Sequence, residues 1–486
     1  MEGGEQAMAD AELCLLSATE LTRLLRRREV SAREVLAAHL RRIEELNPQI
    51  NAIVTPAADH AERAAAAADE AIVSRGPLGP LHGLPVAHKD LTETKGIRTT
   101  YGSPARADHV PDVDSVVVEN LTRAGAVTVG KTNTPEWGTG AQTYNAVFGA
   151  TRNPYDLSKT AGGSSGGAAA ALAARLVPLA DGTDLGGSLR IPASFCNVVG
   201  LRPSVGRVPV WPSADPFFTF SVAGPMARTA ADVALMMRAL GRPDPRSPLS
   251  HHVPAERFAD PLERDFTGTP IAWSPDLGGL PVDERVARAM APARDVLAGL
   301  GARVVDRDPD LTGADEVFLT WRAWYYVLTL DELYTDQPES VGASTAWNIE
   351  VGRKVTAADL VRAQRLRTAL YHRMREFLED HEFLVTLVSP VPPFDVDSPY
   401  PDSVAGSTSE SYLDWLRSCY RISATGLPAA SVPFGFTPEG HPVGVQVVGR
   451  PGDDVGVLQL AHAIETATGT GRRLPGLTAS GVADDA

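Results

Sequence analysis

From about residue 80 onward, short apolar runs alternate with helix-forming stretches and glycine-rich turns. The runs at Leu84–Ala87, Ala126–Val129 and Leu176–Ala180 have the length and composition of buried strands. Strands that alternate with helices assemble into a sheet that the helices cover. Since 43% of the 486 residues are hydrophobic, the chain can build a large core. The pattern therefore predicts an α/β protein.

Helices are predicted on both sides of this region. Ser17 with Glu20, and Ser31 with Glu34, have the spacing of capping boxes, so a helix is expected to start at each. The second helix is expected to end at Asn47-Pro48. The other elements expected are helices at 57–73, after Thr229, at 283–299 and near 454–467, mostly helix over 310–380, and strands at Arg303–Val305, Glu382–Val388 and Pro442–Val448.

No repeat and no long linker divides the chain, so we expect a single domain over residues 1–475. Its expected parts are N-terminal helices at 1–75, a motif-bearing core at 76–245, a variable helical substrate region at 246–380, and C-terminal strands with a helix at 381–475. Residues 476–486 have the composition of a flexible tail.

The chain carries a formal net charge of −15, so neither nucleic acid nor an anionic membrane is an expected partner. No signal peptide is recognised, and no uncharged apolar run reaches membrane-spanning length. Cys14, Cys196 and Cys419 are widely spaced, which fits reduced thiols in a cytoplasm rather than disulfides or a zinc site. The histidines form no metal-binding pattern, so no metal and no cofactor are expected.

Lysine is scarce among the 45 basic residues, and the five lysines are Lys89, Lys95, Lys131, Lys159 and Lys354. We attribute the excess of arginine to a GC-rich genome. Each of the five lysines therefore raises the question of which property of lysine an arginine would lack at that position. Lys95, Lys159 and Lys354 are expected on the surface, and Lys131 is expected to structure a loop.

Three segments carry the candidate chemistry: GLPVAHKD at 83–90, AGGSSGG at 161–167 and ADGTDLGGSLRIPA at 180–193. Taken alone, a GGSSGG run is more often a flexible loop or an anion-binding nest than a catalytic site. In the third segment, glycines directly before Ser188 allow a tight turn that aims successive N–H groups into one concavity. Such a concavity can stabilise the oxyanion of an acyl-transfer intermediate, with the Ser188 hydroxyl beside it.

A serine nucleophile needs a base, and the first segment offers His88 and Lys89. Neighbours in an extended strand point to opposite faces, so only one of them can face the site. Burial can depress the pKa of a lysine by about 3–5 units, whereas an arginine stays protonated. The apolar run before Lys89 suits such burial, and Asp90 opposes it unless its side chain faces elsewhere.

The stretch Gly162-x-Ser164-x-Gly166 also fits the nucleophile elbow of α/β-hydrolases. This alternative makes Ser164, not Ser188, the acylated residue. It requires an Asp and then a His downstream, and no later histidine lies in a supporting motif.

Taken together and in this order, the three segments resemble the motifs of the amidase signature family. Lys89 lies 75 residues before Ser164, which lies 24 residues before Ser188. Further strings similar to the family are GKTNTPEWG at 130–138, FGATRNPYD at 148–156, VVGLRPSVGRVP at 198–209, GLPAASVP at 426–433 and PVGVQVVG at 442–449. The resemblance is dense over residues 80–240 and weak over 246–380.

The resemblance implies a mixed sheet flanked by helices and a Ser–cisSer–Lys triad. Ser188 would be the acylated nucleophile, and Lys89 would be the base. Ser164, joined to Gly163 by a cis peptide bond, would relay the proton between them and later return it to the leaving amine. The oxyanion would be held by the N–H groups of Leu185, Gly186, Gly187 and Ser188.

Other residues near these motifs are expected to support the site. Asp184 and Arg190 flank Ser188, and we expect a buried ion pair rather than direct chemistry. Ser165 either packs the glycine-rich turn or hydrogen-bonds within the site. Trp137 and Gly138, at the end of the GKTNTPEWG string, are the candidate substrate contacts.

Two aromatic groups leave core and substrate pocket open as alternatives: the helical stripe Phe318, Trp321, Tyr325 and Leu328, and the run Phe217, Phe218 and Phe220. A stripe of this kind is more often part of the core than of a substrate pocket. The aromatic content of this region favours an amide with an aryl or otherwise apolar group. Esters and carbamates undergo the same chemistry and are expected side activities.

Three functional classes compete. The first is an amidase that hydrolyses the C–N bond of a small-molecule carboxylic amide. The second is the catalytic subunit of a glutamine-dependent tRNA amidotransferase, although CYRISAT at 419–425 lacks the pattern expected before GLPAASVP. The third is a non-catalytic binding protein, which would need neither Lys89 nor the two serines. A homodimer is the default assembly.

Overall fold

The fold is organised around one mixed β-sheet of eleven strands in the order β1-β3-β2-β8-β10-β9-β16-β17-β13-β11-β12. The computed structural model describes residues 12–477. The strands of this sheet are β1 (Ile53–Pro56), β2 (Pro85–Lys89), β3 (Val127–Thr132), β8 (Leu179–Asp184), β9 (Val199–Arg202), β10 (Val222–Ala227), β11 (Pro270–Ser274), β12 (Arg303–Asp306), β13 (Phe383–Leu387), β16 (Ala429–Phe436) and β17 (Pro442–Val448). Strand β2 is parallel to β3 and β8, and β11 is parallel to β12 and β13. The other neighbours are antiparallel, so the predicted α/β class with a mixed sheet is confirmed.

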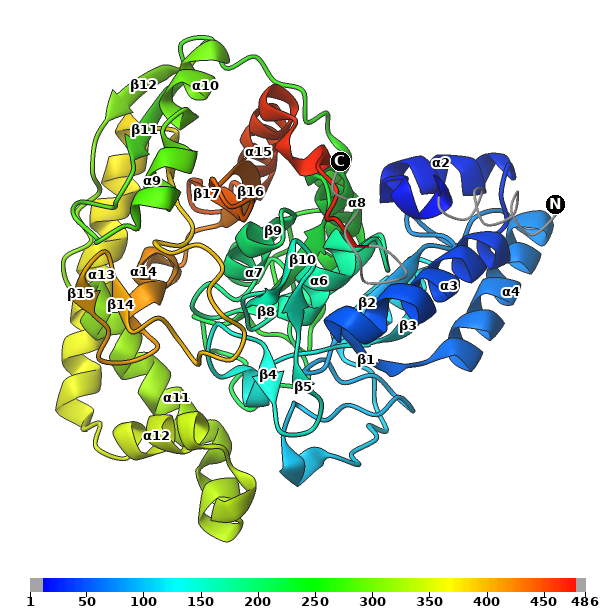
Figure 1. Cartoon of the computed structure of the whole chain (residues 1–486), viewed down its shortest axis with the longest axis horizontal. Helices are drawn as coiled ribbons and strands as arrows, with labels where there is room; N and C mark the ends of the chain where they lie inside the picture. The colour runs from blue at the N-terminus through cyan, green and yellow to red at the C-terminus, as the bar shows by residue number, and fades with distance from the viewer. Residues whose placement is uncertain (1–11, 478–486) are drawn as a thin grey trace.

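Helices surround the sheet (Figure 1). They are α2 (Ala18–Arg27), α3 (Ala32–Ile50), α4 (Ala58–Ser74), α5 (Val116–Arg123), α6 (Gly166–Ala173), α7 (Arg190–Phe195), α8 (Ala230–Leu240), α9 (Glu284–Met290), α10 (Ala293–Gly299), α11 (Ala314–Asp336), α12 (Ala343–Gly352), α13 (Ala357–Asp380), α14 (Arg417–Thr425) and α15 (Asp454–Thr468). Three small hairpins are formed by β4 (Tyr144–Asn145) with β5 (Gly149–Ala150), β6 (Arg152–Asn153) with β7 (Asp156–Thr160), and β14 (Ser403–Val404) with β15 (Ser407–Thr408). Helices α6 and α7 contact each other and the central strands, whereas α8 contacts α2, α5 and α15.

Helices α11, α12 and α13 lie together at one side of the molecule, opposite the N-terminal helices α2–α4 (Figure 1). Helix α11 contacts α12, α13 and α14. The predicted helical character of residues 310–380 is confirmed. None of the helices within residues 12–477 is both long enough and apolar enough to cross a membrane.

The two predicted capping boxes are present. The hydroxyl oxygens of Ser17 and Ser31 accept hydrogen bonds from backbone N–H groups three residues later. The carboxylates of Glu20 and Glu34 accept from the cap residues in return. Both predicted helix starts are therefore confirmed.

The predicted end of the second helix at Asn47-Pro48 is wrong, because α3 continues to Ile50 with Pro48 in its last turn. The Asn47 side-chain oxygen accepts hydrogen bonds from the N–H groups of Ala52 and Ile53 just after the helix, at 2.9 and 2.8 Å. These bonds hold the last turn although proline donates none. Asn51, with a φ of +52°, then ends the helix.

Other predicted boundaries also move. The helix predicted at 283–299 is divided into α9 and α10 by Pro292, which lacks the N–H that would continue it. Strand β8 starts and ends later than the apolar run Leu176–Ala180, so it leads directly into the turn that carries Ser188. From residue 478 on, the tail predicted at 476–486 lies outside the described residues.

Helix α6, which directly follows Ser164 and Ser165, is buried along its whole length. Its residues are only glycine, alanine and leucine, and it contacts β2, β3, β8 and β10. A Cβ on Gly167 would lie 2.3 Å from the backbone nitrogen of Asn133, so no larger residue fits there. This close packing fixes the two serines against strands β2 and β8.

Candidate active site

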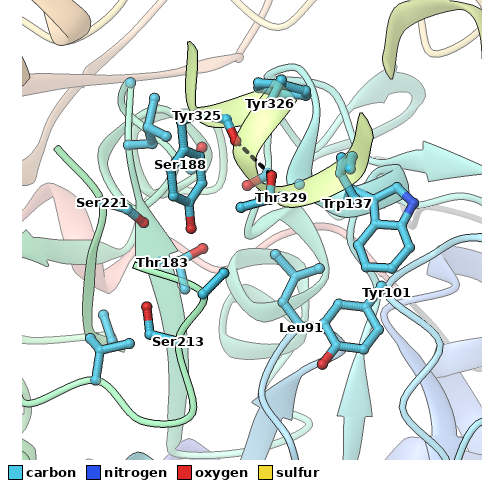
Figure 2. A pocket seen from close by; sticks show the side chains of 18 of the residues that line it. Leu91, Tyr101, Trp137, Thr183, Ser188, Ser213, Ser221, Tyr325, Tyr326 and Thr329 are labelled. Carbon is cyan, nitrogen blue, oxygen red and sulfur yellow. Dashed lines mark hydrogen bonds between the residues drawn. The ribbon is translucent and has the colours of Figure 1, made fainter. Parts of the chain in front are cut away.

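A cavity of about 600 Å³ lies at the carboxyl ends of the parallel strands β2 and β8 (Figure 2). Strand ends of this kind are a frequent place for ligand sites in α/β proteins. The sequence-predicted residues that line the cavity are Trp137, Gly138, Ser164, Leu185, Gly186 and Ser188. The structure thus gathers residues from three separate segments around one space.

Lys89, the last residue of β2, is buried beside this cavity. Its Nζ donates to three hydroxyl oxygens, at 2.7 Å to Ser164, 3.0 Å to Ser165 and 2.9 Å to Thr183. Burial lowers the pKa of Lys89 to about 7, against the charges of Asp181 and Asp184, which favour the protonated form. A lysine with this pKa has a large neutral fraction near pH 7 and can accept a proton.

The neighbours of Lys89 face elsewhere. The His88 ring hydrogen-bonds to the Asp181 carboxylate and, at 3.0 Å, to the Thr128 hydroxyl. The Asp90 carboxylate accepts from the Thr100 N–H and hydroxyl. Neither side chain hydrogen-bonds to the Lys89 ammonium, whose acceptors are the three neutral hydroxyl groups.

Ser164 and Ser188 approach the cavity from different segments. The peptide bond between Gly163 and Ser164 is cis, and the Ser164 hydroxyl accepts from Lys89. The N–H of Ser165 donates to the Ser188 carbonyl oxygen at 3.2 Å, which joins the two segments. Within residues 12–477 no histidine hydrogen-bonds either serine, so the nucleophile-elbow alternative lacks its base.

The turn that follows β8 differs from the expected oxyanion hole in one group. The N–H of Gly187 donates to Asp184 Oδ1 at 3.0 Å and is therefore engaged. The N–H groups without an acceptor among the described residues are those of Leu185, Gly186 and Ser188. Gly187 has a φ of +121°, and a Cβ on it would lie 2.6 Å from the Cβ of Cys419. The expected set of four free N–H groups is therefore corrected to three, and Gly187 shapes the turn.

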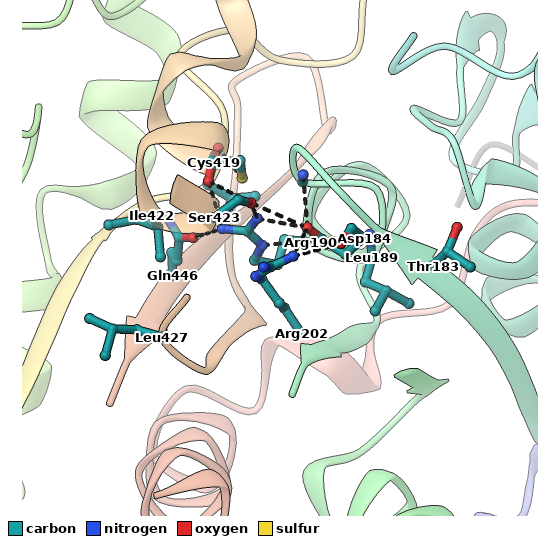
Figure 3. Close-up of polar contacts among 12 residues, drawn as sticks. Thr183, Asp184, Leu189, Arg190, Arg202, Cys419, Ile422, Ser423, Leu427 and Gln446 are labelled. Atoms are coloured by element: carbon teal, nitrogen blue, oxygen red, sulfur yellow. Dashed lines mark hydrogen bonds and ion pairs between the residues drawn. The ribbon is translucent and has the colours of Figure 1, made fainter. Parts of the chain in front are cut away.

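Behind this turn, the Asp184 carboxylate lies between two guanidinium groups (Figure 3). Arg190 Nη2 lies 2.9 Å and Arg202 Nη1 3.1 Å from Asp184 Oδ1. Burial disfavours the charged carboxylate, but the two arginines outweigh burial and hold the pKa of Asp184 well below its ordinary value. Arg190 also donates to the carbonyl of Cys419 at 3.1 Å and to the hydroxyl of Ser423 at 2.7 Å. The network ties the turn to α14, away from the cavity itself.

The far wall of the cavity is built from α11 and the segment around Trp137 (Figure 2). The Trp137 ring stacks on Tyr101 with 4.8 Å between ring centroids. The aromatic stripe of α11 is divided: Phe318 and Tyr325 line the cavity, whereas Trp321 packs against the core and Leu328 is exposed. The core prediction is thus confirmed for Phe318, which is buried in the core and also lines the cavity, and for Trp321, whereas Tyr325 belongs to the cavity wall.

The aromatic run at 217–220 does not line this cavity. Phe218 stacks on Tyr325 at 4.0 Å, Phe220 is buried and Phe217 is exposed. Phe218 and Phe220 therefore support the wall by packing against aromatic residues of α11, and Phe217 does not.

Sequence reasoning missed several residues of the cavity. Thr183 accepts from Lys89, and a signal for it existed, because Asp181 and Thr183 share one face of β8 by strand alternation. Arg322, Tyr326 and Tyr412 also line the cavity. Arg322 and Tyr326 are four residues apart on α11, but no sequence pattern links them to Tyr412, which meets Arg322 only through tertiary packing.

The other lysines and the possible metal ligands lie apart from these contacts. Lys131 is buried on β3 and donates to the carbonyl of Thr92 and the hydroxyl of Thr94, so it holds the loop after β2. Lys95 and Lys354 are exposed, and Lys159 is half-buried. Among residues 12–477, no three side chains of His, Cys, Asp and Glu gather as ligands for a metal ion.

Comparisons with known proteins show similarity over nearly the whole chain. The family described as Amidase matches residues 34–458. The chain is 36% identical to an acylamidase of Rhodococcus erythropolis over 94% of this chain and 96% of that protein. It is 34% identical to a glutamyl-tRNA(Gln) amidotransferase subunit of Methylococcus capsulatus over 96% and 99%, respectively.

A solved structure with the same fold is that of a bacterial aryl acylamidase of the amidase signature family. It superposes with a TM-score of 0.87 at 29% identity, covering 93% of this chain and 96% of that one. The chain therefore belongs to the amidase signature family, whose enzymes are hydrolases acting on amide C–N bonds.

Proposed function

We propose that this enzyme hydrolyses small carboxylic amides through an acyl-enzyme on Ser188, with Lys89 as base and Ser164 as relay. The observation that carries the proposal is the 2.7 Å hydrogen bond between Lys89 Nζ and Ser164 Oγ. The lysine is buried, and within residues 12–477 its ammonium forms no ion pair with a carboxylate. An arginine could not act here, because it does not lose its proton. Ser188 lines the same cavity as Ser164 and has a hydroxyl free of hydrogen bonds within residues 12–477.

Acylation begins when neutral Lys89 accepts the proton of Ser164, which in turn accepts the proton of Ser188. The Ser188 oxygen forms a bond to the amide carbonyl carbon, and the carbonyl oxygen becomes an oxyanion. The free N–H groups of the turn are its donors, namely those of Leu185, Gly186 and Ser188. When the C–N bond breaks, the proton on Lys89 returns through Ser164 to the leaving nitrogen.

Deacylation uses the same relay, with water in place of Ser188 as the nucleophile. A water molecule attacks the acyl carbon while its proton passes through Ser164 to Lys89. The bond between Ser188 and the acyl carbon then breaks, and the proton returns to Ser188. The carboxylic acid leaves, and the enzyme recovers its starting protonation.

The cavity wall supports a substrate with an aryl or apolar group. Trp137, Tyr101 and Tyr325 present aromatic surface to the cavity, and Leu330 adds apolar surface. The structural similarity to an aryl acylamidase points the same way. Ester and carbamate bonds are proposed as side activities, since the same acyl transfer cleaves them.

Labelling with a fluorophosphonate probe tests this proposal. Mapping of the labelled peptide by mass spectrometry is expected to find Ser188, and Ser188→Ala is expected to lose both the label and the hydrolysis of acetanilide. Ser158→Ala, at an exposed serine outside the contacts of Lys89, is the comparison that should retain the label. A label on Ser164 in the active enzyme would overturn the assignment of the nucleophile.

A second candidate is the catalytic subunit of a glutamine-dependent tRNA amidotransferase, favoured by 34% identity over nearly the whole chain. Such a subunit works with partner chains. Glutaminase activity that appears only with partner subunits, together with no hydrolysis of simple amides by the chain alone, would favour this candidate.

We also propose a cytoplasmic homodimer that needs no metal, cofactor or nucleic acid. The negative net charge of −15 supports the absence of a nucleic acid partner. Size-exclusion chromatography with light scattering tests the dimer, and activity after treatment with a chelator tests the metal requirement.

A further inference from the structure

Arg322 of α11 is a buried cation in the wall of the cavity. It is 6% exposed and lines the same space as Ser188. The neighbours that influence its charge are the phenols of Tyr326 and Tyr412, and no carboxylate within residues 12–477 forms an ion pair with it. A buried charge is costly unless an opposite charge or several hydrogen bonds accompany it.

Only some of the N–H groups of the Arg322 guanidinium have a hydrogen-bond acceptor within residues 12–477. Its Nη1 donates to the side-chain oxygen of Asn348, and its Nη2 donates to the hydroxyls of Tyr326 and Tyr412. The guanidinium also lies 4.5 Å from the ring centroid of Tyr326. Arginine has five N–H donors, so the Nε–H and one Nη1 proton have no acceptor among the described residues.

Tyr412 adds another unused donor at the same place. Its oxygen accepts from both Arg322 Nη2 and Asn348 Nδ2, the latter at 2.8 Å. The phenol proton has no acceptor within residues 12–477, although the side chain is only 9% exposed. Burial raises the pKa of Tyr412, so the phenol keeps this proton. The orientation of Asn348 is fixed, because its Nδ2 also donates to the Ser344 carbonyl at 2.6 Å.

Tyr326 provides the internal comparison. Like Tyr412, it accepts from Arg322 Nη2, here at 3.0 Å. Its own proton, however, goes to the Thr139 hydroxyl at 2.9 Å. Of the two phenols that hold Arg322, Tyr412 alone therefore has a proton left for a ligand.

Other buried arginines of the described chain are compensated differently. Arg190 and Arg202 share the carboxylate of Asp184. Arg175 and Arg228 donate to backbone carbonyl oxygens. Arg322 differs from all four because it lines the cavity and is held by neutral side-chain groups. The cluster offers a positive charge and free donors but no free acceptor.

We propose that Arg322 and Tyr412 form a subsite for a carboxylate of the substrate, so that the preferred amides carry an acidic group besides the scissile bond. This inference rests on the proposed amide hydrolysis at Ser188. The carboxylate would accept from the Tyr412 hydroxyl and from the unused N–H groups of Arg322. Charge-assisted hydrogen bonds of this kind are the strong ones in proteins.

The subsite lies close to the reacting groups along α11. Phe318 packs on the turn with the free N–H groups, since a Cβ on Gly186 would lie 2.9 Å from its ring. Arg322 follows Phe318 by four residues, which is about 6 Å along a helix. A short acidic group on either the acyl or the amine part of a small amide is therefore of the right size to reach it.

Two matched pairs of anilides test the proposal, and each replaces a carboxylate by a methyl ketone. The acyl-side pair is succinanilate and levulinanilide, and the amine-side pair is para-acetamidobenzoate and para-acetamidoacetophenone. In at least one pair we expect kcat/KM to be about tenfold to a hundredfold higher for the acid, as a charge-assisted hydrogen bond gives. The pair that responds tells which part of the substrate carries the carboxylate.

Three variants separate recognition from structural support. Arg322→Gln and Tyr412→Phe are expected to reduce the preference for the acid to less than about threefold while the ketone is still hydrolysed. Tyr326→Phe is the matched control: it also removes one hydroxyl from Arg322 but no free donor, so the preference should remain. If Arg322→Gln fails to fold, the contrast between Tyr412→Phe and Tyr326→Phe in their preference for the acid still tests the carboxylate subsite.

Several outcomes would overturn the inference. Equal rates for acid and ketone in both pairs would reject a carboxylate subsite while leaving the amidase proposal intact. Equal loss of both substrates in Arg322→Gln and in Tyr412→Phe would show that the cluster only joins α11 to its neighbours. Loss of all amide hydrolysis by the wild-type enzyme would instead reject the proposed function.

Discussion

Two sides of the cavity are built on different principles. We call one side the floor, which consists of Ser164, Thr183, Ser188 and the turn at 185–188, together with the buried Lys89 that hydrogen-bonds to Ser164 and Thr183. The other side is the wall, which consists of Trp137, Phe318, Arg322, Tyr325, Tyr326 and Tyr412. The floor comes from strand ends and glycine-rich turns of the central sheet, and the wall comes mostly from helix α11 and the segment before α14.

The two sides of the cavity differ in which of their hydrogen-bonding groups remain free for a substrate. On the floor, Lys89 is fully engaged with hydroxyls, and the free groups are a nucleophilic hydroxyl and N–H donors. On the wall, aromatic rings dominate, and Arg322 with Tyr412 leave donors unused. This difference fits the proposed function, in which the floor performs acyl transfer and the wall selects the amide. Changes on the floor should abolish turnover, and changes on the wall should shift preference.

The largest effect is expected for Lys89→Arg on the floor. The charge is kept but cannot be lost, so kcat on acetanilide should fall by about a thousandfold or more. Steady-state kinetics measures this loss, and circular dichroism checks the fold. Lys354→Arg, at an exposed position, is the control and should keep wild-type activity. Retained activity in Lys89→Arg would remove the base from the mechanism.

Asp184→Asn tests whether the support behind the floor is structural. The change leaves the buried guanidinium groups of Arg190 and Arg202 without their carboxylate, which is expected to cost about 3–5 kcal/mol of unfolding free energy. Urea denaturation measures it. Asp156→Asn, at a half-buried carboxylate outside this network, should cost much less. Equal stability of the two variants would contradict the role given to the pair.

The pH dependence of both activity and stability should reflect the lowered pKa of Lys89. Below its pKa of about 7 the lysine is protonated, so kcat/KM should fall about tenfold for each pH unit and level off above the pKa. The unfolded chain still binds this proton up to pH 10.5, so unfolding free energy should rise with pH between about 7 and 10.5. Lys89→Met should therefore gain stability at pH 7 and lose this advantage toward pH 10.5.

A flat activity profile between pH 6 and 8 would contradict this, provided that the substrate does not titrate. Lys131, whose pKa burial lowers to about 8, is the other buried lysine that titrates near this range. It contacts neither serine, so Lys131→Met should leave the activity profile in place even if stability changes.

The smallest effect is expected on the wall. Trp137→Leu removes an aromatic face from the cavity, so KM for an anilide should rise about threefold to tenfold with little change in kcat. An aliphatic amide of similar length should be affected less. Equal effects on both amides would show that the ring does not discriminate aryl groups.

The structure shows why sequence motifs located some residues around the cavity and overlooked others. Lys89, Ser164 and Ser188 stood in local motifs, and their chemistry could be reasoned from residue type. Gly187 was assigned with its neighbours as an oxyanion donor, because only the tertiary structure shows its N–H directed to Asp184. Thr183 was overlooked although strand alternation placed it on the face of β8 that meets Lys89.

By itself the sequence determined the α/β class, the capped helix starts and the segments that form the floor, because strand length, capping and glycine turns are local properties. The tertiary structure alone decided the wall. Arg322 and Tyr412 are separated by 90 residues and carry no shared pattern. Their hydrogen bonds depend on how α11 packs beside the segment before α14, and such packing is set by shape complementarity across the whole fold rather than by any local period.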